Sequence, residues 1–154
     1  MRKAFTPAEI AAVIAVFALD RLSKMAVVAW LKAKGSIELF GWLHLTYVEN
    51  TGAAFGVMRG NNALLMVVSV LLVAGLVFFK RDMRRYGKWA NAGAVLVLGG
   101  ALGNLYDRVF LGKVIDFVDF RIWPVFNAAD SCISTGIAMM MLGFWKEDKT
   151  EAEK

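Results

Sequence analysis

Residues 63–79, ALLMVVSVLLVAGLVFF, form an apolar run that contains no charged side chain. An α-helix rises about 1.5 Å per residue and the hydrocarbon core of a bilayer is about 30 Å thick, so one crossing takes roughly 17 to 25 residues. The run has this length. Because a helix satisfies its own backbone hydrogen bonds, the segment is first of all a candidate membrane-spanning helix.

Three further apolar runs have a similar length, and 58% of the 154 residues are hydrophobic. We therefore predict a mainly α membrane protein with four transmembrane helices. Asp20 and Arg21 interrupt the first run where a cleavage site would lie, so we expect a retained helix rather than a signal peptide. The predicted helices cover approximately residues 8–31, 62–80, 89–109 and 126–146 of a single integral membrane domain, 1–154.

Basic residues concentrate in the segments before the first helix, between the second and third, and after the fourth. The connection 80–88 alone holds five of them. By the positive-inside rule, both termini and this connection are cytoplasmic, whereas 32–62 and 107–125 lie outside. The net charge of +5 is thus explained by topology, and we expect no nucleic-acid partner.

The outer segment SIELFGWLHLTYVENTGAAFGVM, residues 36–58, partly alternates apolar and polar positions and is rich in β-branched and aromatic residues. This pattern is typical of strands. We predict a short β segment over approximately 35–58, lying at the membrane surface.

Polar residues of the predicted helices and of the outer segment fall in the outer half of the bundle. A charge near the bilayer centre costs roughly 2.5–3.5 kcal/mol even on lenient insertion scales, so each charge needs a partner or a task. The sequence therefore predicts a polar site that opens toward the outer side. Its members are Asp20, Lys24, Asn50, Asn104, Asp107, Arg108, Asn127 and Asp130.

Structural roles explain some of these residues equally well. Asp20 and Lys24, spaced i and i+4, share a helix face and can form an ion pair. Asp107 can pair with Arg108 or with a cation of another helix. The carboxylates of Asp116 and Asp119 can also be ordinary loop residues in water.

Carboxylate chemistry is what remains after the other hydrolytic sites are considered. Cys132 and His44 are each the only residue of their type, and there is no H-E-x-x-H motif for a zinc protease. Asp116 follows the third helix and Asp130 begins the fourth, so the short connection can bring them together. Two close carboxylates share a proton, and the ionised one can then activate a water molecule.

Five sequence blocks resemble, in order and spacing, those of lipoprotein signal peptidases, also called signal peptidase II. The family consists of bacterial inner-membrane aspartic peptidases that remove the signal peptides of prolipoproteins. The blocks are DRLSK (20–24), NTGAAFG (50–56), GGALGNLYDR (99–108), VIDF (114–117) and WPVFNAAD (123–130).

The resemblance implies four transmembrane helices, a small periplasmic β-cradle, cytoplasmic termini and an active site that faces the periplasm. It implies metal-free cleavage, without a cofactor, on the amino side of a diacylglyceryl-modified cysteine. We expect a monomer in the bilayer. The matched positions are Asp116 and Asp130 as catalytic residues, Asn50, Asn104, Arg108, Asn127 and Asp20 as substrate-binding residues, and Lys24 and Asp107 as structural polar residues.

Asp119 falls outside the family pattern, and we expect it to take no part in catalysis. A different class of function is a small proton-coupled transporter or channel, in which Asp20, Lys24, Asp116 and Asp130 relay protons. A third class is a membrane scaffold without enzymatic activity. In that case, replacing Asp116 or Asp130 by Asn would leave function intact.

Overall fold

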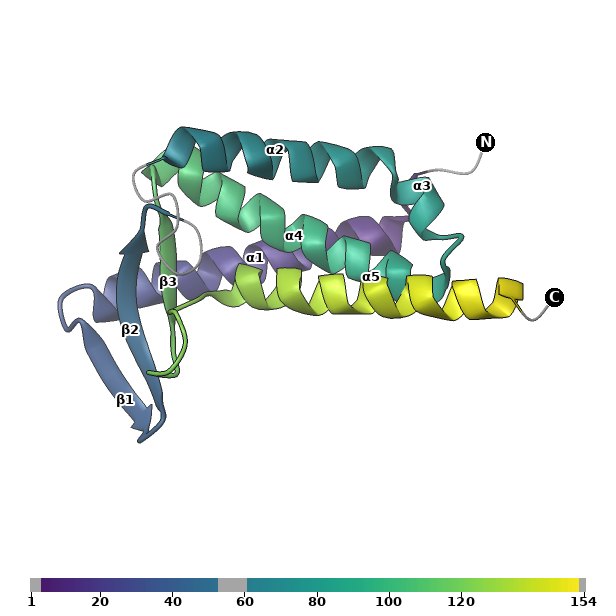
Figure 1. Cartoon of the computed structure of the whole chain (residues 1–154). Helices are drawn as coiled ribbons and strands as arrows, with labels where there is room; N and C mark the ends of the chain where they lie inside the picture. Colours follow the sequence, from purple (N-terminus) through teal and green to yellow (C-terminus); the bar gives the residue numbers. More distant parts are fainter. Residues whose placement is uncertain (1–3, 53–60, 153–154) are drawn as a thin grey trace.

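The computed structural model describes residues 4–52 and 61–152 as a helical bundle with a small sheet across one end (Figure 1). The start of α1 and the end of α5 lie at the opposite end from the sheet. The fold is mainly helical with an antiparallel sheet, as the sequence predicts. The elements are α1 (Pro7–Leu31), β1 (Ser36–Phe40), β2 (Leu43–Asn50), α2 (Asn62–Phe78), α3 (Lys80–Met83), α4 (Gly87–Leu111), β3 (Val114–Asp119) and α5 (Ala128–Ala152).

Local sequence explains where α1 begins and where α4 ends. Thr6 Oγ1 accepts a hydrogen bond from the backbone N–H of Glu9, and Glu9 Oε2 accepts one from the backbone N–H of Thr6, which is a capping box. Gly112 follows α4 with a φ of +72°, a left-handed conformation that glycine adopts without strain. The chain therefore turns directly from α4 into β3.

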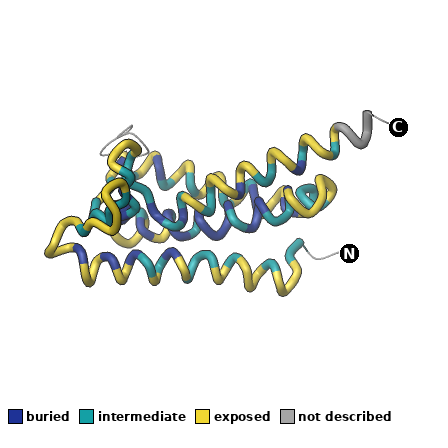
Figure 2. The backbone as a smooth tube through the Cα atoms, turned by 90° about the horizontal axis from the view of Figure 1, so that it is seen from below, coloured by how far each residue is buried: buried dark blue, intermediate teal, exposed yellow. Residues whose placement is uncertain are grey.

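The central helix is α4, which contacts α1, α2 and α5 and holds most of the buried helical residues, dark blue in Figure 2. Glycines allow this close packing. A Cβ added at Gly136 of α5 would lie 2.6 Å from the backbone oxygen of Gly93, and one at Gly99 would lie 2.7 Å from Val16 of α1. The two backbones can approach this closely only because neither Gly93 nor Gly136 has a side chain.

The sheet has the strand order β1-β2-β3, and both pairs are antiparallel. The sequence prediction limits strands to 35–58 and therefore misses β3; residues 53–58 of that range lie outside the described residues. After β3 the chain reverses: Val118 donates to the backbone oxygen of Phe126 at 2.8 Å, and Phe126 donates back at 3.1 Å. This return places the start of α5 beside β3.

An apolar cluster fastens the sheet to the bundle. Val27 and Leu31 from the outer end of α1 pack against Ile115 and Phe117 of β3. All four side chains are buried. Because the cluster joins β3 to α1, the sheet has a fixed position relative to the helices.

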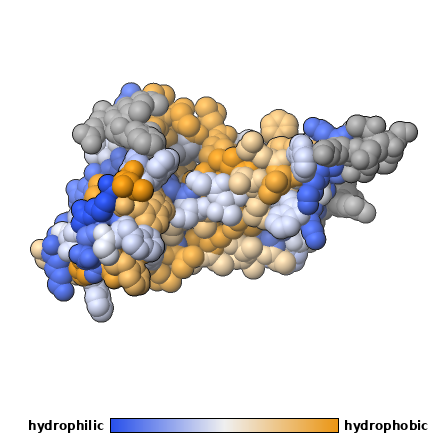
Figure 3. Space-filling view, turned by 60° about the horizontal axis from the view of Figure 1, so that its bottom comes forward, coloured by the Kyte–Doolittle hydropathy of each residue, from blue (hydrophilic) through white to orange (hydrophobic). Residues whose placement is uncertain are grey.

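Large apolar side chains are exposed on the outward faces of the helices, among them Ile14, Leu22, Leu71 and Met141. Figure 3 shows hydrophobic residues over the middle of the molecule and hydrophilic ones at both ends. Among the described residues, α4 and the Ala128–Asp148 part of α5 are long and apolar enough to cross a membrane, and α2 is a shorter apolar helix. This surface suits a hydrocarbon environment around the middle of the bundle.

The glycine contact between α4 and α5 gives a prediction about stability. Gly136→Ala should lower the free energy of unfolding by about 1–3 kcal/mol, because the new methyl group meets the backbone of Gly93. Gly75→Ala on α2 is the matched control, since nothing lies within 4 Å of its Cβ position. That control should be neutral or stabilising by up to about 1 kcal/mol. Thermal unfolding in one detergent compares the two, and equal midpoints would contradict the packing argument.

Candidate active site

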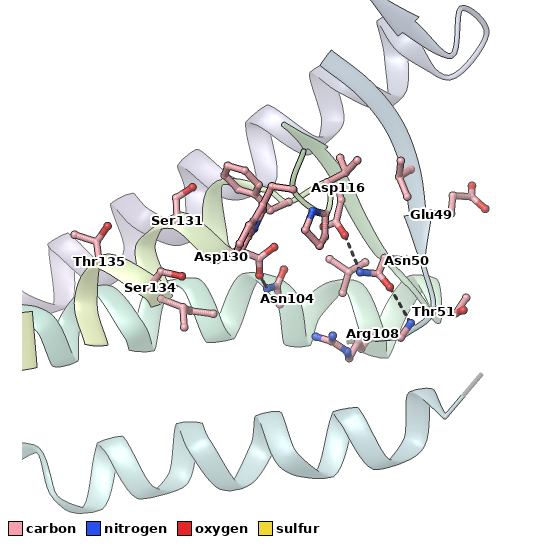
Figure 4. A pocket seen from close by; sticks show the side chains of 18 residues that line it. Glu49, Asn50, Thr51, Asn104, Arg108, Asp116, Asp130, Ser131, Ser134 and Thr135 are labelled. Carbon is pink, nitrogen blue, oxygen red and sulfur yellow. Dashed lines mark hydrogen bonds between the residues drawn. The ribbon is translucent and has the colours of Figure 1, made fainter. Parts of the chain in front are cut away.

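A cleft of about 970 Å³ lies where the sheet meets the bundle. Residues of β2, β3, α4, the segment 123–126 and α5 form its walls (Figure 4). Asp116 and Asp130 both line it, as do Asn50, Asn104 and Arg108. The cleft therefore contains both carboxylates that the sequence singles out.

Asp116 lies on β3 with only 2% of its surface exposed. Asn50 Nδ2 donates to its Oδ2 at 2.8 Å, and Asn127 Nδ2 donates to its Oδ1 at 2.6 Å. Burial, reinforced by the negative charge of Asp130, raises the pKa of Asp116 to about 7 despite these hydrogen bonds. The carboxyl of Asp116 therefore retains its proton over a wide pH range in which an ordinary aspartate is ionised.

Asp130 is fixed by the start of α5. The backbone N–H of Asn127 donates to Asp130 Oδ2 at 3.2 Å, and the backbone N–H of Asp130 donates to Asn127 Oδ1 at 2.9 Å. These reciprocal bonds form a capping box, with Asn127 immediately before the first helical residue. Asn104 Nδ2 of α4 donates to Asp130 Oδ1 at 2.7 Å. The orientation of the Asp130 carboxylate is therefore set by two separate elements.

Asn127 connects the two carboxylates. Its side chain is fully buried and does not line the cleft. Its Nδ2 donates to Asp116 and also lies 3.2 Å from Asn104 Oδ1, while its backbone and Oδ1 bond Asp130. A single residue behind the cleft wall thus fixes Asp116 relative to Asp130.

A buried cluster of charges supports this arrangement from α1. Lys24 Nζ lies 2.8 Å from Asp20 Oδ2 and 2.9 Å from Asp107 Oδ2, and it donates to Asn104 Oδ1 at 2.9 Å. All four side chains are buried. Because Asn104 in turn donates to Asp130, the hydrogen-bonded chain extends from Lys24 to the cleft.

The cations that pair with Asp107 come from α1. Arg21 forms an ion pair with its Oδ1, and the backbone N–H of Ile115 donates to its Oδ2 at 3.2 Å. The sequence left two possibilities for Asp107, a pair with Arg108 or a pair with a cation of another helix. The structure shows the second, with Arg21 and Lys24 as the cations. Arg108 instead lines the cleft.

Asp20 is fully buried and does not line the cleft, although the family resemblance implies a substrate contact. Its Oδ1 accepts a hydrogen bond from the backbone N–H of Ala129 at 3.0 Å. A Cβ at Gly103 would overlap the Asp20 carboxylate, so the missing side chain at this position gives Asp20 room. Asp20 therefore holds the first turn of α5 against α1 and α4.

Asp119 lies on β3 outside the cleft. It is not a water-exposed loop residue, since Thr46 Oγ1 donates to its Oδ2 at 2.8 Å and the backbone N–H of Arg121 donates to its Oδ1 at 2.8 Å. Burial opposes ionisation, but these hydrogen bonds and the Arg121 charge outweigh it and lower the pKa of Asp119. Its contacts fix the turn at Arg121, whose φ is +65°.

Sequence reasoning missed several residues of the cleft wall: Glu49, Thr51, Ser131, Ser134 and Thr135. Ser134 and Thr135 follow Asp130 by about one helical turn, so helical spacing could have placed them on the same wall. The positions of Glu49 and Thr51 depend on the pairing of β2 with β3, which the sequence did not predict.

The described residues contain no group of three or more His, Cys, Asp and Glu side chains arranged to hold a metal ion. The two catalytic candidates are bonded by amides rather than by further carboxylates or histidines. That the site works without a metal stays a prediction.

Comparison with known proteins identifies the family. The family described as Signal peptidase (SPase) II matches residues 12–146. The chain belongs to the signal peptidase II family. A relative from Halothermothrix orenii, named lipoprotein signal peptidase, is 41% identical over 138 residues, which cover 89% of this chain and 94% of the relative. Another of that name, from Gloeobacter violaceus, is 44% identical over 147 residues, covering 93% and 84%.

Two solved structures have a similar fold. A bacterial membrane enzyme matches with a TM-score of 0.87 at 29% identity, covering 97% of this chain and 94% of that one. A second bacterial membrane enzyme matches with a TM-score of 0.77, also at 29% identity. The chain is therefore a bacterial membrane protein. Its family supports the peptidase hypothesis over the transporter or channel alternative.

The buried cluster around Lys24 gives a prediction about stability. Lys24→Met removes the cation between Asp20 and Asp107. The free energy of unfolding should fall by about 3–5 kcal/mol, because two buried carboxylates lose their partner. The control is Lys113→Met, since the Lys113 pair with Glu49 is partly exposed and contributes about 0–1 kcal/mol. Thermal unfolding of both variants measures the difference. A Lys24 variant as stable as the control would refute the role of the cluster.

Proposed function

We propose that Asp116 and Asp130 together activate a water molecule that cuts a prolipoprotein on the amino side of its diacylglyceryl-modified cysteine. One observation carries the proposal: Asn127 bonds both carboxylates at the wall of one cleft. Two carboxylates held in this way, in a site of low dielectric, are suited to share one proton.

The enzyme class follows from the family. A member of the signal peptidase II family is an aspartic peptidase that removes signal peptides from prolipoproteins. In such an enzyme the two carboxylates act as a unit, one as acid and one as base. The cleft supplies a pair of this kind and space for a peptide beside it.

The environment of each carboxylate favours a division of roles. Asp116 is buried beside the charge of Asp130 and keeps the proton, which it donates as a hydrogen bond to the scissile carbonyl oxygen. Ionised Asp130 takes a proton from the water as the water oxygen attacks the carbonyl carbon. Asp130 then passes this proton to the leaving nitrogen as the C–N bond breaks. No charge has to leave the cleft during the cycle.

Amides and a guanidinium around the pair suit an extended peptide backbone. Asn50, Asn104 and Arg108 line the cleft, so they are the residues we assign to substrate binding. Asn127 acts from behind the wall by orienting both carboxylates. We assign Asp20, with Lys24 and Asp107, to positioning α5 rather than to contact with the peptide.

We further propose a single integral domain with four membrane spans, at approximately 8–31, 62–80, 89–109 and 126–146, and an outer β segment over approximately 35–58. The basic segment that includes α3 is at the opposite end of the bundle from the sheet (Figure 1). By the positive-inside rule this end and both termini are cytoplasmic. The cleft then faces the periplasm from the bacterial inner membrane, and the enzyme works as a monomer.

Substitution of the pair tests the proposal. Asp116→Asn and Asp130→Asn should each lower kcat for a diacylglyceryl prolipoprotein by about 10²–10⁴-fold, because one member of the acid–base pair is lost. Asp119→Asn is the matched control on the same strand as Asp116. It should keep most of its activity, since Asp119 lies outside the cleft. Processing is followed with purified protein by the release of the signal peptide.

Near wild-type rates for both Asp116→Asn and Asp130→Asn would contradict the two-aspartate mechanism. A loss at Asp119 as severe as at Asp116 would mean that the wrong carboxylate had been chosen. Thermal unfolding of each variant distinguishes a damaged fold from damaged chemistry.

The raised pKa of Asp116 predicts how activity depends on pH. Its carboxyl is protonated below about pH 7 and loses the proton as the pH rises through that value. Both carboxylates are then negative and neither can donate to the scissile carbonyl. We expect kcat/KM to fall about tenfold per pH unit above about pH 7. A kcat/KM that stays constant up to about pH 9 would exclude Asp116 as the proton donor.

A further inference from the structure

Two hydroxyl groups line the α5 wall of the cleft beyond the carboxylate pair. Ser134 and Thr135 follow Asp130 along α5 on the side away from the sheet (Figure 4). Four residues of helix correspond to about 6 Å along the axis. Both side chains are exposed to the cleft rather than buried against a neighbouring helix.

The other serine hydroxyls of the described helices are satisfied by their own backbone. The side chains of Ser23, Ser69 and Ser131 donate to the backbone oxygens of Asp20, Leu65 and Asn127 at 2.9, 2.8 and 3.1 Å. Within the described part of the chain, Ser134 and Thr135 make no such bond. A hydroxyl in an apolar medium is costly to leave without a partner, so these two are suited to a ligand that brings acceptors.

The chemistry of the substrate limits what that ligand group is. The extended part of the signal peptide beside the carboxylate pair is assigned to Asn50, Asn104 and Arg108. The part that continues into the membrane as a helix satisfies its own backbone and offers apolar side chains. The glyceryl group on the cysteine carries ester carbonyls, which are acceptors, a few bonds from the sulfur and therefore close to the scissile bond. Ile133 on the same wall offers an apolar contact to the acyl chains that continue from these esters.

We propose that Ser134 and Thr135 form the subsite for the ester groups of the lipid on the substrate cysteine. This inference rests on the proposed function, and it adds the residues that distinguish a lipid-modified cysteine from a bare one. In this arrangement the hydroxyls donate to the ester carbonyl oxygens while the acyl chains leave the cleft toward the bilayer.

The test combines two enzymes with two substrates. Ser134→Ala with Thr135→Val removes both hydroxyls with little change in shape. One substrate peptide carries a diacylglyceryl cysteine, and the other carries the dialkyl ether analogue, which lacks the carbonyls. For the ester substrate the double variant should lose about 5- to 100-fold in kcat/KM, mainly through KM, as expected for two hydrogen bonds. For the ether substrate it should match the wild type.

Ser69→Ala is the control, because its hydroxyl donates within α2 and lies outside the cleft. It should leave both substrates unaffected. An unchanged kcat/KM of the double variant for the ester substrate would overturn the subsite. An equal loss for both substrates would also overturn it, since such a loss does not depend on the carbonyls.

The same experiment separates this inference from the proposed function. A wild-type enzyme that cleaves the diacylglyceryl peptide, together with an inactive Asp116→Asn variant, supports the mechanism whatever the double variant does. Failure of the wild type to cleave that peptide would overturn both. The inference therefore fails alone when cleavage depends on Asp116 and the double variant either cleaves the ester substrate like the wild type or loses equally on both substrates.

Discussion

The rest of the site depends on the contacts of the buried Lys24 ammonium group. Its two carboxylate partners each reach a different element: Asp20 bonds the first turn of α5, and Asp107 bonds the start of β3. Its third partner, Asn104, bonds the Asp130 carboxylate of α5. Buried charges are tolerated only when their partners are all in place. Helices α1, α4 and α5 and strand β3 must therefore meet at one point.

A second ionic cluster holds the opposite end of the bundle. Lys80 is buried and bonds Glu9 and Asn91, while Arg84 donates to Glu9 at 2.6 Å. This cluster joins α1, the short helix α3 and α4. The ionic clusters at the two ends, together with the close glycine contacts between them, fix the relative height of the helices. The cleft therefore lies at a defined level of the bundle.

The sequence indicated the mainly helical fold, the small sheet and the polar residues of the site because long apolar runs leave few other structures and buried charges need partners. It could not assign partners, since Asp107 had several cations within reach along the chain. It also missed β3, although VIDFVD is rich in β-branched and aromatic residues, because its partner strand lies far away in sequence. The role of Asn127 depends on that strand, so it became visible only in three dimensions.

The capping box at the start of α5 links folding with chemistry. Asp130 closes the first turn of the helix through Asn127 and is at the same time the proposed base. Glutamate also serves in capping boxes, but its side chain is one methylene longer and would place the carboxylate differently relative to Asn104 and Asp116. The helix cap therefore accepts either acidic residue, whereas the proposed role of Asp130 as the base depends on the length of the aspartate side chain.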